Sequence, residues 1–276
     1  MRSLLAAALV TLAPATALAQ GVLVAPTSVF IDARVRTASL LLVNPNDDPA
    51  EVEVLTLFGY PITDSLGRLR LYTAEQPDST EPSAATWVKI FPRRMTIAPK
   101  AQQTVRLLVT PPPALGDGEY WTRLIIVARG GRLPITAAGD SGSAVTVGLS
   151  VEVRTVIPLL FRKGRVQTGA ALSALRGARE GDSLAVRVHV ERLGNAAVLG
   201  TARGELIDSA GAVRASFTTP FSAYHSIEPR YAAAVGGLPA GQYLLRFEVA
   251  PGRSDLPPET VLPFRTVRDS VTVDLR

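Results

Sequence analysis

Two short motifs around serines are the parts of this chain that most resemble catalytic centres. Residues 181–184 (Gly-Asp-Ser-Leu) match the block around the nucleophile of one group of serine esterases, and residues 139–142 (Gly-Asp-Ser-Gly) are similar to the serine block of trypsin-like proteases. A nucleophilic serine needs a base within hydrogen-bond reach. Neither histidine has an aspartate three residues before it, and an alternating strand pattern follows Ser183. We therefore interpret both motifs as turns and expect a protein that is not an enzyme.

Side chains that could bind a metal or a cofactor are few and scattered. The chain has no Cys, and its two histidines, His189 and His225, have no cluster of carboxylates beside them in the sequence. Metal sites need several such ligands at short spacings. Neither the G-x-G-x-x-G fingerprint after a strand nor the G-x-x-x-x-G-K-[ST] loop occurs. The sequence predicts no metal site and no cofactor.

The composition and the N-terminus indicate an exported, folded protein. Of the 276 residues 47% are hydrophobic and 19% are charged, which is typical of globular chains. Arg2 precedes an apolar stretch that ends in Ala17-Leu18-Ala19, so we expect a signal peptide at residues 1–19, cleaved after Ala19. No later apolar stretch is long enough to predict insertion into a membrane. The net charge of +5 is not concentrated in one half, so we expect no nucleic-acid partner.

Short alternating or β-branched segments recur along the mature chain and predict an all-β protein. They are separated by turn clusters such as residues 44–49 and 111–118, rich in Pro, Asn, Asp and Gly. This spacing is typical of antiparallel sandwiches. We predict two β-sandwich domains in tandem, at residues 20–163 and 164–276. Residues 170–180 favour one or two helical turns, and residues 73–86 and 129–143 are predicted to be loops.

One predicted strand, residues 144–157, has an unusually regular pattern. Its apolar side chains share one face, whereas polar residues and a glycine occupy the other. The apolar face consists of Val145, Val147, Leu149, Val151 and Val153. Periodicity alone is also typical of a strand whose apolar face lies in its own core. The position of the strand, after a Gly-rich segment and directly before the interdomain linker, favours a binding role instead.

Four further segments occur in an order and spacing that carry a family resemblance. Residues 25–30 (Ala-Pro-Thr-Ser-Val-Phe) open the mature chain, and residues 40–45 form a strand ending at Asn-Pro. Residues 97–106 combine a Pro-centred turn with a Gln-x-x-Val-Arg strand, and residues 118–120 (Gly-Glu-Tyr) open a strand that runs to Arg129. Together with residues 144–157, these segments resemble the periplasmic pilus-assembly chaperones of the chaperone/usher pathway across most of the mature chain.

The resemblance implies a periplasmic protein of two immunoglobulin-like sandwiches set at an angle, with a subunit-binding cleft between and along them. Members of this family lend a strand to a pilus subunit that lacks its last strand, so the pairing is strand addition. The matching donor residues here are Val147, Leu149, Val151 and Val153. The implied partners are pilus or fimbrial subunits and an outer-membrane usher, with a homodimer as a further form of the free protein.

The chain departs from the family where the subunit's C-terminal carboxylate is held. The family uses an Arg in the first strand and a Lys near the end of the donor strand; here the positions hold Thr27 or Ser28, and Pro158. Because Pro158 has no N–H, we expect strand pairing to break or bulge there. Three cations are candidates for a substitute anchor: Arg123, Arg154 and Lys163. Arg123 ranks first because its strand should lie next to the donor strand.

A different function class fits many of the same observations. An exported adhesion or structural module of two β-sandwiches would also use an exposed strand edge, in this case for self-association. The missing anchors favour this alternative, whereas the order of the matched segments favours the chaperone.

Overall fold

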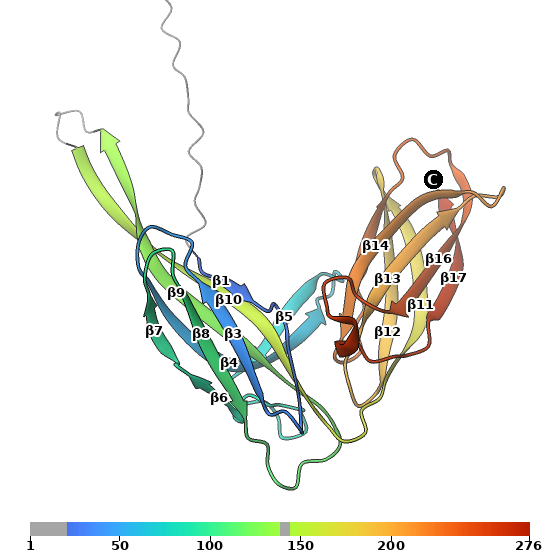
Figure 1. The fold of residues 1–276 in the computed structure, drawn as a ribbon. Helices are drawn as coiled ribbons and strands as arrows, with labels where there is room; N and C mark the ends of the chain where they lie inside the picture. The colour runs from blue at the N-terminus through green and yellow to red at the C-terminus, as the bar shows by residue number, and fades with distance from the viewer. Residues whose placement is uncertain (1–20, 139–143) are drawn as a thin grey trace, which may run out of the picture.

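The computed structural model of this protein describes residues 21–138 and 144–276 (Figure 1). The predicted signal peptide and its cleavage site lie outside the described residues, as do residues 139–143; for residues 131–138 and 144–150 only the backbone is described. Apart from one 3-10 turn, Pro258–Thr260, the regular structure in these ranges is all β. Two sandwich domains form the arms of a V (Figure 1), which confirms the predicted fold class.

The first sandwich contains ten strands in two sheets. One sheet has the order β1-β3-β8-β6 and the other β2-β10-β9-β4-β5, with β7 also pairing with β4. All pairs are antiparallel except β2 with β10. The bounds are β1 (Leu23–Ala25), β2 (Val29–Asp32), β3 (Thr37–Val43), β4 (Ala50–Thr63), β5 (Leu69–Ala74), β6 (Val88–Phe91), β7 (Arg94–Ile97), β8 (Gln102–Val109), β9 (Gly118–Ala138) and β10 (Ala144–Lys163).

Alternate residues of these strands fill the space between the two sheets. Leu40 and Leu107 from one sheet, and Ile126 and Leu159 from the other, are fully or almost fully buried in the same apolar cluster. Apolar residues recur at every second position of these segments because every second side chain of a strand points to the same face, here the core. The opposite face of the β10 sheet points away from this core, toward the second domain.

The second sandwich is built from seven strands, with sheet orders β11-β12-β15 and β14-β13-β16-β17. Its core contains Val186, Val188 and Phe247, all fully buried. The esterase-like motif lies in the turn before β12, where Gly181 has a φ of 61° and Ser183 starts the strand. The bounds are β11 (Thr168–Glu180), β12 (Ser183–Gly194), β13 (Val198–Ile207), β14 (Val213–Ala223), β15 (Arg230–Ala234), β16 (Gly241–Pro251) and β17 (Val267–Leu275).

Two local predictions are wrong. Residues 170–180 are not helical but belong to β11, which pairs with β12 and has an irregularity between Ser173 and Arg176. Helix propensity is a weak preference that strand pairing and burial of Ala170 and Leu175 override. Residues 129–138, predicted as part of a loop, continue strand β9 and pair with β10.

The two domains are joined by a buried polar hub at Glu119. This carboxylate is fully buried and accepts hydrogen bonds from Arg162 Nε (2.8 Å), Trp121 Nε1 (3.0 Å) and the N–H of Ala197 (3.0 Å). Arg162 also donates to the carbonyl of Thr260 (2.7 Å). Since the hub joins residues of both sandwiches, it fixes their relative orientation, and an apolar cluster around Trp121, including Phe58, Leu199 and Tyr224, packs beside it.

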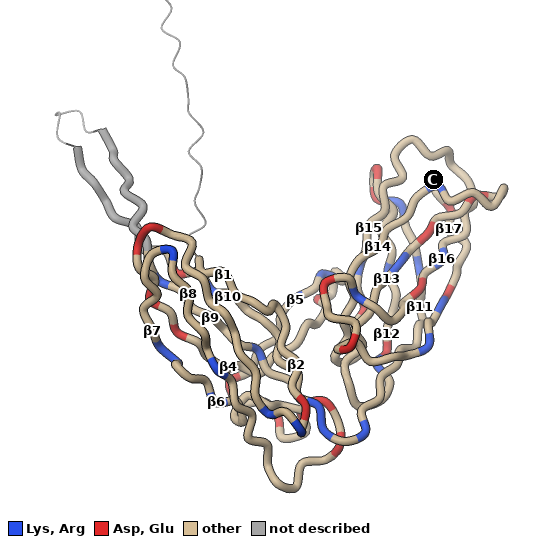
Figure 2. The backbone as a smooth tube through the Cα atoms, in the orientation of Figure 1, with Lys and Arg blue, Asp and Glu red and all other residues tan. Residues whose placement is uncertain are grey.

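Charged residues of both signs are interspersed along both domains (Figure 2). Many of them form cross-strand ion pairs, for example Arg268 with Glu248 (2.9 Å) on the outer face of the second domain. None of the helical segments in the described part of the chain is long and apolar enough to cross a membrane.

Candidate functional site

Strand β10 has an open edge over part of its length. On one side it pairs with β9 from Ala144 to Lys163. On the other side only β2 pairs with it, opposite Leu159–Arg162. Between Glu152 and Pro158, no strand in the described ranges pairs with this second side. The backbone donors and acceptors there are available to a strand from another protein.

Two of the predicted donor residues, Val151 and Val153, point to the same side of the sheet as the core of the first domain but are not part of that core. Val151 and Val153 are half-buried and share a face with the buried Ile157. They are therefore neither sealed in the sandwich nor fully exposed. The backbones of Val147 and Leu149 pair with those of Ile135 and Leu133. The structure describes only the backbone of these residues.

The opposite face of β10 begins with a charged cluster. Arg154 Nε lies 2.6 Å from Glu152, which also accepts a hydrogen bond from Arg129 (2.8 Å). These hydrogen bonds, the one from Arg154 foremost, lower the pKa of the Glu152 carboxyl below its usual value. Arg154 is exposed and already has a carboxylate partner, so it is poorly suited to anchor a ligand.

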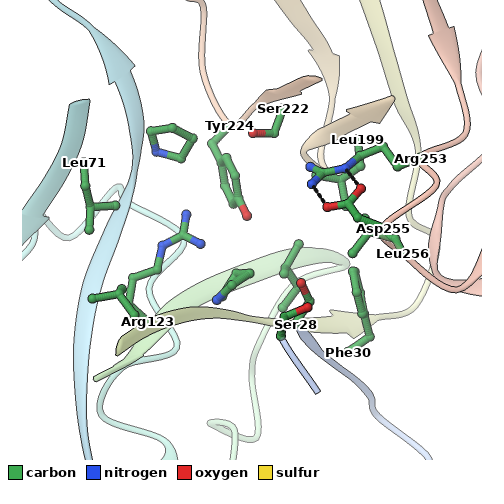
Figure 3. Close-up of a pocket in the computed structure, with 15 residues that line it drawn as sticks. Ser28, Phe30, Leu71, Arg123, Leu199, Ser222, Tyr224, Arg253, Asp255 and Leu256 are labelled. Carbon is green, nitrogen blue, oxygen red and sulfur yellow. Dashed lines mark hydrogen bonds and ion pairs between the residues drawn. The ribbon is translucent and has the colours of Figure 1, made fainter. Parts of the chain in front are cut away.

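Further along this face, a cavity of about 370 Å³ lies between the two domains (Figure 3). Thr27, Ser28 and Pro158, the positions where the family anchors are missing, all line it. Arg123 lines it as well, because Arg123 on β9 is the residue directly paired with Pro158 on β10. The structure thus places a cation one strand away from the expected position, at a separation typical of cross-strand neighbours.

The guanidinium of Arg123 is buried and incompletely satisfied. The residue is 6% exposed, Nε donates to the carbonyl of Gly59 (2.9 Å), and the guanidinium carbon lies 4.9 Å from the centre of the Tyr224 ring. One terminal nitrogen is buried without a hydrogen-bond partner. A buried cation is costly unless it is paired and hydrogen-bonded. The cavity is therefore suited to an anionic group such as a carboxylate.

The second domain supplies the other wall of the cavity. Tyr224 projects into it between Arg123 and Arg253 (Figure 3). Burial raises the pKa of the Tyr224 phenol above its usual value. Arg253 is paired with Asp255 (Nε to Oδ1 2.9 Å), so its charge is already balanced. Among the described cavity residues, Arg123 is the cation that has no carboxylate partner.

The remaining candidates lie elsewhere. Lys163 Nζ donates to the carbonyl of Leu115 and does not line the cavity. The expected break at Pro158 is wrong: pairing with β9 continues through it, and pairing with β2 begins at Leu159. The ladder instead shifts register between Ser150 and Glu152. No group of three or more metal-binding side chains occurs in the described residues.

Sequence reasoning missed the cavity residues of the second domain. Tyr224, Arg253 and Leu256 come from turns and loops whose local sequence carries no binding signal. Their role depends on how the domains pack, and the contacts that set this packing, from Ala197 to Glu119 and from Arg162 to Thr260, join residues far apart in the chain. Arg123 could be found because neighbouring strands bring it beside Pro158.

No protein-family model and no curated protein matches this chain. Solved structures of pilus chaperones are similar to most of it. The chaperone CupB2 of Pseudomonas aeruginosa is 15% identical, with 92% of this chain and 100% of that chain covered and a TM-score of 0.44. The YadV chaperone is 14% identical, covering 91% and 99%, with a TM-score of 0.45. The chaperone of the CsuC–CsuE chaperone–tip adhesion subunit complex from Acinetobacter baumannii is 14% identical, covering 90% and 97%, also at 0.45.

Proposed function

We propose that this protein is a periplasmic chaperone that binds pilus or surface-fibre subunits by strand addition along β10 and passes them to an outer-membrane usher. The observation that carries the proposal is the open edge of β10 beside an interdomain cavity, where the guanidinium of Arg123 has a buried terminal nitrogen without a partner. An incoming strand would hydrogen-bond to Glu152–Pro158 while its terminal carboxylate reaches Arg123.

The energetics of this arrangement are adequate for capture without a covalent step. Backbone hydrogen bonds would define the register, and the half-buried Val151 and Val153 would complete the apolar core of the subunit. Full burial of each such side chain is worth roughly 1.5–3 kcal/mol. Because Arg123 is already buried and oriented by Gly59 and Tyr224, the carboxylate would meet a cation that loses little freedom on binding.

Delivery to an usher requires a second surface that stays open when a subunit is bound. The outer face of the β1-β3-β8-β6 sheet provides one, since it lies on the other side of the sandwich from the cavity. There Phe91 is 76% exposed and, with Leu108, Lys89 and Arg106, borders a depression of about 670 Å³. We assign this apolar and basic face to the usher as part of the same proposal.

The proposal is tested by Val151→Arg, with Ile157→Arg as the matched control on the same face of β10. Val151→Arg should abolish capture of a co-expressed candidate subunit in a pull-down and leave urea unfolding nearly unchanged. Ile157→Arg should unfold the first domain, because it places an unpaired charge in the core. If Val151→Arg unfolds the protein like the control, Val151 belongs to the core and the donor role is wrong; full capture by a folded variant would equally refute it.

The alternative, a self-associating adhesion or structural module, would give a different outcome in the same experiment. In that case a folded Val151→Arg variant would lose its own association and the candidate subunit would not be captured even by the unaltered protein.

A further inference from the structure

Strand β5 is the last strand in the sheet order β2-β10-β9-β4-β5, and its outer edge is open. It pairs with β4 along its length and with no other strand in the described part of the chain. The hairpin tip before it is tied to the second domain: the N–H of Arg230 donates to the carbonyl of Gly67 (2.9 Å), and the N–H of Glu228 donates to the Thr63 hydroxyl (2.9 Å). The strand is thus held between the two arms of the V (Figure 1).

Apolar side chains are exposed on both faces of β5. Leu69 is 61% and Leu71 47% exposed on one face, and Tyr72 is 39% exposed on the other. Edge strands are usually protected from pairing by charged side chains. Here the guanidinium of Arg70 is drawn toward Asp64 at the hairpin tip, with Nε 3.3 Å from Oδ2. The side chain of Arg70 nevertheless stays 57% exposed, so the edge presents both apolar side chains and a cation to a further strand.

A second copy of β5 fits this edge with two-fold symmetry. When the two-fold axis passes through Leu71, antiparallel pairing places Leu71 opposite Leu71 of the second copy. The same register places Arg70 opposite Tyr72 and Leu69 opposite Thr73. Apolar side chains then meet at the centre, a cation faces an aromatic ring, and no like charges are opposed. Closed two-fold interfaces of this kind are the commonest in homo-oligomers.

We infer that β5 is a self-association edge, at which two copies of this chain pair antiparallel about Leu71. The inference does not depend on the proposed chaperone function. Since β5 and the open edge of β10 are separated by β9 and β4 in the sheet, the dimer leaves the backbone edge of β10 unpaired; the side chain of Leu71, however, also lines the interdomain cavity. This dimer is also distinct from the alternative described above, in which two copies associate through the edge of β10.

The absence of Cys from the sequence allows a direct test of this register by single-cysteine cross-linking of the full chain. Opposed residues of antiparallel strands have Cα atoms about 4.5–5.5 Å apart, which is within disulfide range. Leu71→Cys should therefore form disulfide-linked dimers under mild oxidation. Leu69→Cys, whose copies would be roughly 13 Å apart along the strands, and Val156→Cys on β10 should remain monomeric.

The mass of the protein in solution provides the second measurement. The unaltered chain should have twice the monomer mass in light scattering, and Leu71→Arg, which opposes two like charges, should halve it. Leu69→Arg, which faces Thr73 in this register, should remain dimeric. A monomeric unaltered chain, equal cross-linking at positions 69 and 71, or cross-linking at position 156 instead would overturn the inference.

Discussion

Replacing Arg123 with Met separates a binding role from a structural one. The substitution removes the hydrogen bond from Nε to Gly59, worth about 1.5–3 kcal/mol for a charged donor. It also removes the stacking on Tyr224, worth about 0.5–2 kcal/mol. Against this loss, it relieves the burial of a cation with an unpartnered nitrogen, a penalty of several kcal/mol. We expect the free energy of unfolding to change by less than about 1 kcal/mol, or to rise.

Binding should respond in the opposite direction. Truncating one partner of a buried, hydrogen-bonded charge pair costs about 2–5 kcal/mol, which corresponds to roughly 30-fold to 4,000-fold in affinity. A peptide that copies the last strand of a candidate subunit can be prepared with a free C-terminal carboxylate and with a C-terminal amide. The difference in affinity between the two peptides measures the contribution of the carboxylate. Arg123→Met should strongly weaken binding of the peptide acid and hardly change binding of the peptide amide. Binding can be followed by the fluorescence of Trp121, whose ring centre lies 4.8 Å from that of Tyr224 beside the cavity.

Arg154→Met is the control for this experiment, since Arg154 is exposed and paired with Glu152 outside the cavity. It should leave the difference in affinity between acid and amide unchanged. Equal losses for acid and amide with Arg123→Met, or a large loss of stability without a selective loss of the acid, would refute the carboxylate-anchor reasoning.

Two further predictions concern the contacts that hold the domains and the β4–β5 hairpin in place. Glu119→Gln should cost about 3–5 kcal/mol in unfolding free energy, because it leaves the largely buried Arg162 without its counter-ion, and small-angle scattering should show a wider range of interdomain angles. At the hairpin tip, the N–H of Arg68 and then its guanidinium lower the pKa of Asp64 to about 2 from 3.8. This carboxylate therefore stabilises the protein above about pH 4, and the stabilisation is lost as the pH falls through about 2. Asp64→Asn should abolish that part of the acid dependence of the urea midpoint; an unchanged profile would contradict the assignment.

The strands could be predicted from the sequence where buried apolar residues alternate regularly with exposed polar ones. The alternation in residues 144–157 located β10, and turn residues separated most strands correctly. Residues 170–180 were misassigned because several good helix formers outweighed a strand signal blurred by the irregularity after Ser173. Strand β5 was missed because the alternation of Arg68, Leu69, Arg70 and Leu71 covers only four residues, and both leucines are exposed instead of filling the core.

The candidate site was predictable only in part. Arg123 was accessible because pairing between adjacent strands brings it beside Pro158. The wall formed by Tyr224 and Arg253 depends on the angle between the domains, which is set by Glu119 and its long-range partners. Pairing through Pro158 was unexpected, but β2 begins to pair only at Leu159, so the missing N–H falls where β10 has no partner strand on its second side.

The most direct test of the central proposal is backbone amide hydrogen exchange in β10, measured with and without a bound candidate subunit. In the free protein, amides in residues 152–157 that point away from β9 should exchange quickly, whereas those bonded to β9 should be protected. Subunit binding should slow the outward amides strongly and leave β5 unaffected. A stable complex in which these outward amides exchange as fast as in the free protein would show that the subunit binds elsewhere.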